Sequence, residues 1–242
     1  MLFLNVGANR KVTFSGAISG TGTFLSQNGA GRTVVSNSVA SGVGLSVPQG
    51  TMEVATGGSA PGGATVNSNG TLLISGGTVG TTSLGANVEG RIELAPGSHW
   101  SSTLNLGACS SSASISQSGG SLQSTTINIG NPTGSGDFNS WSYSMSAGTL
   151  GTTNLIVGVS AIGISSFNQS GGTATVSGSV ILGNAAGSQG FSPCPTEAST
   201  CRAPGFTWEM SATDDSPCRE PPSFPHPLSL SGLATTIKPP GP

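Results

Sequence analysis

The stretch FNQSGGTATVSGSVILGN, residues 167–184, has no charged residue, histidine, cysteine or proline. It consists of glycine, small hydroxyl residues, three amides, one phenylalanine and a few branched aliphatic residues. Ala174 and Val176 alternate with threonine residues, which is the period-two pattern of a half-buried strand. The phase of this alternation shifts at residues 178–179. The stretch therefore predicts a strand, a corner and the start of a second strand.

The same pattern recurs upstream. Five units each contain a turn glycine, followed 8–11 residues later by a closing glycine. The turn glycines, 20–28 residues apart, are Gly77, Gly97, Gly120, Gly148 and Gly172. The closing glycines are Gly85, Gly107, Gly130, Gly158 and Gly183. Units of this length with short apolar alternations and no helical period are typical of coils in a β-solenoid.

The stretch VEGRIELAPG, residues 88–97, alternates more regularly than the others. It predicts an inner face of Val88, Ile92 and Leu94 and an outer face of Glu89, Arg91 and Glu93. A helix is disfavoured throughout, because Gly, Ser, Thr and Val dominate. We therefore expect an all-β fold of about eight coils over residues 1–188, forming a rod about 40 Å long.

Charge limits the functions that this chain can have. Charged residues make up 7% of the sequence and the net charge is -2, against roughly 25% charged residues in an ordinary soluble domain. So little positive charge argues against nucleic-acid binding and against an anionic membrane surface. In a stacked solenoid, by contrast, ladders of Thr, Ser and Asn can satisfy one another from coil to coil without ion pairs.

The composition changes near Gln189. Residues 189–242 hold 11 of the 15 prolines, three of the four cysteines and half of the charged residues. Proline removes backbone donors and fixes φ, so this segment is expected to be an irregular or disordered tail, too proline-rich to be a regular cap. A shifted reading frame and a genuine proline-rich linker both explain the abrupt change.

The cysteines do not form a recognisable metal site. Cys109, Cys194, Cys201 and Cys218 have no CxxC spacing, and no histidine pair completes a zinc pattern. We expect neither a metal nor a cofactor.

Residues 13–79 resemble the autotransporter-associated β-strand repeat of large bacterial surface and secreted proteins. The stretch GAISGTGTFLSQNGAGRTVVSN (16–37) matches the first half of that repeat, and GVGLSVPQGTMEVA (42–55) matches the second. The later units resemble arrays of the form FxQSGGTVTVSGxLxLG in giant exported bacterial proteins. The resemblance covers about residues 13–188. It implies a right-handed parallel β-helix and export, and it carries no catalytic residues.

The function expected from this resemblance is structural. The chain would be a segment of a bacterial surface or secreted protein that extends a rod and presents adhesive loops, to surface glycans or to other copies of the rod. We do not expect an enzyme. No export signal and no apolar run of about 20 residues is present, so we expect a piece of a longer protein. The alternative is a fragment of a polysaccharide lyase or hydrolase that lacks its catalytic coils.

Three groups of residues are candidates for contact or chemistry. The insertion NPTGSGDFNSWSY (131–143) brings together Asp137, Phe138, Trp141 and Tyr143, and loops that protrude from a repeat scaffold are where recognition is expected. His99 and Trp100 follow a Pro-Gly turn and are expected on a corner loop. The Glu89 and Glu93 carboxylates are expected to lie on one solvated strand face, too far apart for glycoside hydrolysis. Both ends of the rod are expected to expose strand edges, which favours end-to-end association.

Overall fold

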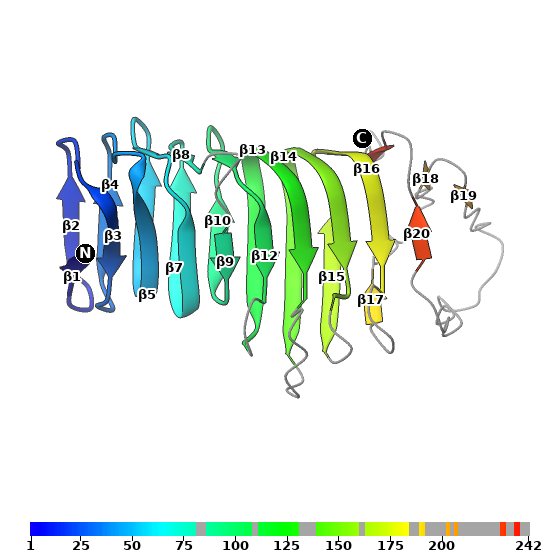
Figure 1. The fold of residues 1–242 in the computed structure, drawn as a ribbon, viewed down its shortest axis with the longest axis horizontal. Coiled ribbons are helices and arrows are strands. Elements are labelled where there is room, and N and C mark those ends of the chain that lie inside the picture. Colours follow the sequence, from blue (N-terminus) through cyan, green and yellow to red (C-terminus); the bar gives the residue numbers. More distant parts are fainter. Residues whose placement is uncertain are drawn as a thin grey trace.

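The computed structural model is all-β (Figure 1). It describes residues 1–80, 86–107, 111–130, 139–159 and 163–183, together with the backbone of five short strands after residue 188. The first nine strands are β1 (Leu2–Leu4), β2 (Lys11–Phe14), β3 (Thr21–Gln27), β4 (Arg32–Val35), β5 (Gly42–Ala55), β6 (Ser59–Ala60), β7 (Ala64–Ser75), β8 (Thr78–Val79) and β9 (Ala86–Val88). The next seven are β10 (Arg91–Leu94), β11 (His99–Ser101), β12 (Leu104–Leu106), β13 (Ala113–Ile129), β14 (Ser140–Val157), β15 (Ile164–Gln169) and β16 (Thr173–Leu182). The last five are β17 (Gln189–Phe191), β18 (Arg202–Ala203), β19 (Phe206–Thr207), β20 (Leu228–Leu230) and β21 (Thr235–Ile237).

The strands stack into three ladders, called here A, B and C, which every coil visits in that order. In the first coil, β1 begins ladder A, β2 begins ladder B, and Ile18 begins ladder C through its bridge to Val39. The later strands are longer and turn through the corners. In β13, residues 114–117 lie in ladder B, 121–123 in C and 127–129 in A. The predicted β-solenoid is confirmed.

The register of ladder B gives the repeat length directly. Parallel pairing joins one residue from each coil, in steps of 19–28 residues: Val12, Thr33, Met52, Leu72, Ile92, Ile115, Tyr143 and Phe167. These seven steps correspond to roughly 34 Å of rod at about 4.8 Å per strand. The 28-residue step, from Ile115 to Tyr143, contains the insertion that the sequence showed.

The core is a narrow column between the three ladders. Inward residues of successive coils stack on one another, and most are aliphatic and fully buried. A second inward column of ladder B joins Phe14, Val35, Val54, Ile74, Leu94, Gln117, Met145 and Gln169. Stacking near-identical coils lets each apolar side chain contact its equivalents above and below, which is how a repeat too small to bury its own face becomes stable.

The predicted turn glycines lie at corners. Gly97, Gly120, Gly148 and Gly172 have φ between 68° and 89°, in the left-handed region. Gly77 is different, because its neighbour Gly76 carries the positive φ of 86°. Gly77 is required by space instead, since a Cβ there would lie 2.7 Å from the Ala55 carbonyl oxygen. Of the closing glycines, Gly85 is outside the described residues, and the other four all have positive φ.

The inward and outward faces predicted for residues 88–97 are largely as found. Val88, Ile92 and Leu94 are at most 1% exposed. Glu89 differs from the expectation, because the chain turns at residues 89–90 between β9 and β10. Glu89 therefore lies on a corner, and Glu93 lies on the face of ladder B.

The segment after residue 188 contains strands that the sequence analysis did not predict. β17 continues ladder B by parallel pairing with β15, so the solenoid register passes the expected boundary. β20 and β21 pair antiparallel with the ladder A and ladder C parts of β16. β18 and β19 form a separate antiparallel pair. The remaining residues of the predicted tail are outside the described part.

Candidate functional site

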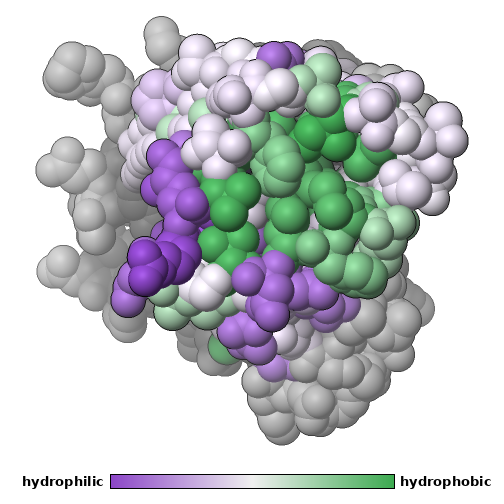
Figure 2. Space-filling view, turned by 90° about the vertical axis from the view of Figure 1, so that its left-hand side faces the viewer, coloured by the Kyte–Doolittle hydropathy of each residue, from purple (hydrophilic) through white to green (hydrophobic). Residues whose placement is uncertain are grey.

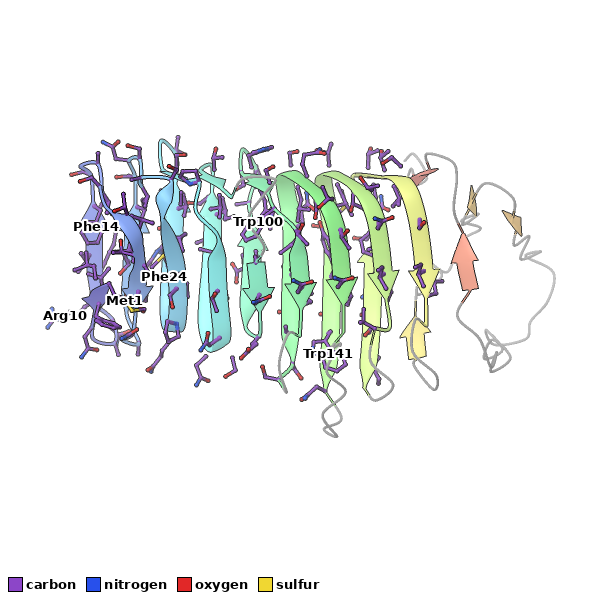
Figure 3. All side chains as sticks on the ribbon, viewed as in Figure 1. Met1, Arg10, Phe14, Phe24, Trp100 and Trp141 are labelled. Atoms are coloured by element: carbon purple, nitrogen blue, oxygen red, sulfur yellow. The ribbon has the colours of Figure 1, made fainter. Side chains whose placement is uncertain are left out.

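The predicted contact loop is not a surface of aromatic side chains. Trp141, which is labelled in Figure 3, is 1% exposed, and Tyr143 is 0% exposed; both belong to β14. Their expected role as surface contacts is therefore wrong. Asp137 and Phe138 lie outside the described residues, so their part of the prediction stays open. The alternation Trp141-Ser142-Tyr143-Ser144-Met145 was the signal for a buried strand, and its inward members are all buried.

Trp141 lies at the corner between ladders A and B. Its indole Nε1 donates a hydrogen bond to the Ser111 carbonyl oxygen at 2.9 Å. Gly107 and Gly163 lie against the ring, where a Cβ would come within 2.1 Å and 2.6 Å of indole atoms, respectively. The ring thus fills space that glycines in the adjoining coils leave free, and its role is packing.

Tyr143 is the only tyrosine of the chain and lies in the inward column of ladder B that begins at Val12. Its hydroxyl donates to Oε1 of Gln117, one coil earlier. Its ring meets Phe167 of the next coil edge to face, with centroids 5.2 Å apart. Burial raises the pKa of the Tyr143 hydroxyl well above its usual value. A phenol that is enclosed and fully paired cannot meet a substrate, so this group is structural.

His99 and Trp100 are on a strand, β11, and not on a corner loop as predicted. Trp100 is 1% exposed and belongs to the inward column of ladder C, between Val79 and Leu122. Its Nε1 has no hydrogen-bond partner among the described atoms. His99 points outward from the same strand and is half-buried. The two side chains lie on opposite faces of ladder C and cannot jointly stack a sugar.

A shallow groove of about 410 Å³ runs across four coils where ladder A turns into ladder B. We call it the corner groove. Its lining residues are Ser68, Asn69, Gly70, Thr71, Gly90, Arg91, Ser112, Ala113, Ser114, Ser140 and Ser142. The cause is a difference in corner length. Between Val88 and Arg91 the corner is only residues 89–90, whereas the preceding coil takes residues 67–70 between their pairing partners Val66 and Thr71. A short corner beside a longer one leaves a depression.

The corner groove presents polar groups that are free to bind. Within the described residues, the side chains of Ser68, Asn69, Thr71, Ser114 and Ser142 make no hydrogen bond to the protein. Gly70 and Gly90 form a floor without side chains, and a Cβ on Gly90 would collide with the Gly70 carbonyl oxygen at 2.4 Å. The site is not visible in the sequence, because its residues come from four different repeat units.

Arg91 supplies the charge in the groove lining. It pairs with Glu93 through Nε and Oε1 at 2.8 Å, and both side chains are substantially exposed, at 56% and 37%. Such a pair is weak and exchanges readily with other partners. In contrast, Glu53 is 8% exposed and accepts hydrogen bonds from Arg32 and from Ser75. Arg91 can therefore turn to a ligand, whereas Glu53 joins coils together.

The carboxylates do not converge. Glu53 is held by Arg32, Glu89 lies on a corner and Glu93 is paired with Arg91. No group of three or more His, Cys, Asp or Glu that could hold a metal ion occurs in the part of the chain that the structure describes. Within that same part, the side chains that line the groove can form hydrogen bonds and one ion pair, but they include no paired acid and base.

The fold places the chain among the β-solenoid proteins. Comparisons with protein-family models, curated proteins and solved structures found no match. Among the described residues, no helix has the length and apolarity that crossing a membrane requires.

Proposed function

We propose that this chain is a structural rod segment of an exported bacterial surface or secreted protein. The observation that supports this most is the unbroken stacking of ladder B from Val12 to Phe167, with one inward residue from each coil. A rod of this kind sets a distance and resists extension because every coil hydrogen-bonds to its neighbours along three ladders.

The outer surface is consistent with a passive rod. Side chains of equivalent coils bond to one another, as in the ladder of Asn87, Asn105 and Asn128, where the amides are linked by bonds of 3.4 Å and 2.7 Å. Export and surface location rest on the resemblance of residues 13–79 to the autotransporter-associated repeat. They are tested by treating intact source cells with protease and following the chain by antibody. Protection equal to that of a cytosolic marker would reject surface display and leave the rod itself unaffected.

A second candidate function is contact with carbohydrate, which the corner groove favours. Free hydroxyl and amide groups beside an exposed guanidinium suit a hydroxyl-rich or carboxylated polysaccharide. In this reading the chain either presents an adhesive surface or is a fragment of a carbohydrate-active β-helix protein whose catalytic coils lie elsewhere.

The two candidates are separated by incubation with a panel of neutral and acidic plant, algal and bacterial polysaccharides. Binding without cleavage that is weakened by Arg91→Ala, but unchanged by Lys11→Ala, would support glycan contact in the groove. Lys11 is a matched control because it occupies the same outward column of ladder B at the end of the rod. No binding would leave the rod as the sole function, and sustained cleavage would overturn the structural proposal.

A further inference from the structure

The corner groove follows the axis of the rod. Four of its lining residues are consecutive partners in one outward column of ladder B, namely Thr71, Arg91, Ser114 and Ser142. Each of them comes from a different coil, and neighbouring members are about 4.8 Å apart along the rod. The groove therefore offers an equivalent position once per coil, and it is a track and not a closed pocket.

The spacing of this track suits an extended β-linked glycan. In such a polymer each pyranose ring advances the chain by close to the rise of one coil, so successive rings can face successive coils. An extended peptide, in contrast, repeats every two residues, at about 6.7 Å, and loses register with the coils. The ligand that fits the track over its whole length is therefore a linear sugar chain.

The groups along the track both donate and accept hydrogen bonds. Among the described residues, the hydroxyls of Thr71, Ser114 and Ser142 have no partner in the protein, and the amide of Asn69 at the edge of the groove is also free. A hydroxyl rotates to suit its partner and can act as donor or acceptor, as the hydroxyls of a sugar do. A polymer with hydroxyls on every ring thus finds a partner on each coil.

The charges around the groove favour a neutral glycan. Arg91 is the single charged side chain in the groove lining that the structure describes. Glu93 is paired with Arg91 at 2.8 Å, and Glu89 lies on the corner two residues before it. One positive and two negative charges leave an excess of one negative charge, which opposes a carboxylated chain. The Arg91–Glu93 pair instead offers donors and an acceptor side by side to neutral hydroxyls.

The groove lining contains no aromatic side chain within the described residues. Large apolar groups such as Trp141 and Tyr143 are buried in the core. Figure 2, which looks along the rod, shows apolar residues gathered in the middle of the face and hydrophilic residues beside them. Without a ring on which to stack, each sugar is held by hydrogen bonds, and these contribute little individually. Affinity for a glycan must therefore accumulate over several coils.

We propose that the corner groove binds four consecutive residues of an extended, neutral, β-linked glycan that lies parallel to the rod, with one sugar ring on each coil. This inference rests on the glycan contact put forward above as the second candidate function, and it adds the orientation, length and charge of the ligand. Gly70 and Gly90 have no side chains and leave room for the rings, while Thr71, Ser114 and Ser142 supply one hydroxyl per coil.

Oligosaccharides of defined length test the proposal with the full chain. The neutral probes are β-1,4-linked mannose oligomers, from the dimer to the hexamer, and β-1,4-linked mannuronate oligomers are their carboxylated counterparts. Calorimetric titration should show that affinity for the neutral series rises by about two- to tenfold with each ring up to the tetramer and then levels off. This affinity should change little between low and high salt, because no net charge is neutralised on binding.

Two leucine substitutions locate the ligand. Ser114→Leu places an apolar side chain in the middle of the track and should lower the affinity for the tetramer by about tenfold or more. Ser166→Leu is the matched control, because Ser166 is the next member of the same column after Ser142 but lies outside the groove lining. Circular dichroism and thermal unfolding identify a variant that fails to fold, and Ser142→Leu then replaces Ser114→Leu.

The possible failures have different meanings. No binding of any oligomer would reject glycan contact and this inference with it. Equal affinity from the dimer to the hexamer, or a preference for mannuronate that salt weakens, would overturn this inference and leave glycan contact standing. Unchanged affinity in Ser114→Leu, or an equal loss in Ser166→Leu, would place the glycan outside the corner groove and overturn the inference as well.

Discussion

The indole of Trp141 lies directly against Gly107, so close that a Cβ on this glycine would be 2.1 Å from the indole Nε1. The two residues belong to adjoining coils, and the widest side chain of the column fits only because the facing corner has no side chain. Gly107 also has a φ of 81°. Gly107 is therefore required for two reasons: the corner needs a left-handed φ, and the indole occupies the place of a side chain.

Three glycine substitutions separate these two demands. Gly107→Ala should lower the free energy of unfolding by about 2–4 kcal/mol, from backbone strain and collision with Trp141. Gly22 has a φ of 62°, but no atom lies within 4 Å of the position that a Cβ would take. Gly22→Ala should therefore lower the free energy of unfolding by only about 1 kcal/mol. Gly16 has neither a positive φ nor an atom close to its Cβ position, so Gly16→Ala should leave the free energy of unfolding almost unchanged. Urea unfolding measures the free energy of unfolding of the three variants. An equal loss in Gly22→Ala and Gly107→Ala would show that the Trp141 indole moves aside without cost.

Tyr143→Phe tests the buried hydrogen bond inside ladder B. The substitution leaves Gln117 Oε1 without the hydroxyl, and a buried acceptor that loses its donor costs about 1–3 kcal/mol. Gln117 also donates to the Thr149 carbonyl oxygen, at 3.0 Å. A double-mutant cycle with Gln117→Met isolates the contact with Tyr143. Additive losses in the double variant would mean that the two side chains are not coupled.

Alkaline pH should unfold the chain through Tyr143. Because burial raises the pKa of this hydroxyl above the value of about 10 for an unfolded tyrosine, the folded chain retains its proton where the unfolded chain releases it. Stability is fully present below about pH 10 and should fall above it by up to about 1.4 kcal/mol per pH unit.

The measurement is direct because Tyr143 is the only tyrosine. Tyrosinate absorbance should rise only together with loss of β-structure in circular dichroism. Tyr143→Phe should remove most of this alkaline dependence. Ionisation of the tyrosine well before unfolding would contradict the enclosed hydroxyl.

The two ion pairs with glutamate should differ in their contribution to stability. Glu53→Ala removes a nearly buried carboxylate that accepts from Arg32 and Ser75, and should cost about 1–3 kcal/mol. Glu93→Ala removes an exposed partner of Arg91 and should cost at most about 1 kcal/mol. Thermal unfolding at low and high salt compares them, and Glu93→Ala should be the more sensitive to salt. An equal loss in both variants would argue that burial of Glu53 adds nothing.

The fold was largely predictable because it depends on local regularity. Alternation at Ala174 and Val176, and glycines at intervals of 20–28 residues, indicate strands and corners without any long-range information. The long insertion that ends with Trp141 and Tyr143 predicts a loop. Their alternation with serine indicated a strand, and the stacking of β14 on β13 decided in favour of the strand.

The corner groove could not be predicted from one repeat. Ser68, Arg91, Ser114 and Ser142 come from four coils, and each is an ordinary outward residue of its own strand. The hollow depends on the length of the corner at residues 89–90 relative to its neighbours. Only the register between coils places those lengths side by side.

The sequence by itself determined the coil: its period, its inward residues and the glycines at its corners. These are consequences of how a chain with alternating small residues pairs with near-copies of itself. The tertiary structure alone decided which residues of neighbouring coils lie against one another, and therefore where the groove lies. Strands β17, β20 and β21 pair with β15 and β16 through their backbones. The sequence did not predict these pairings, because backbone hydrogen bonds depend little on which side chains a strand carries.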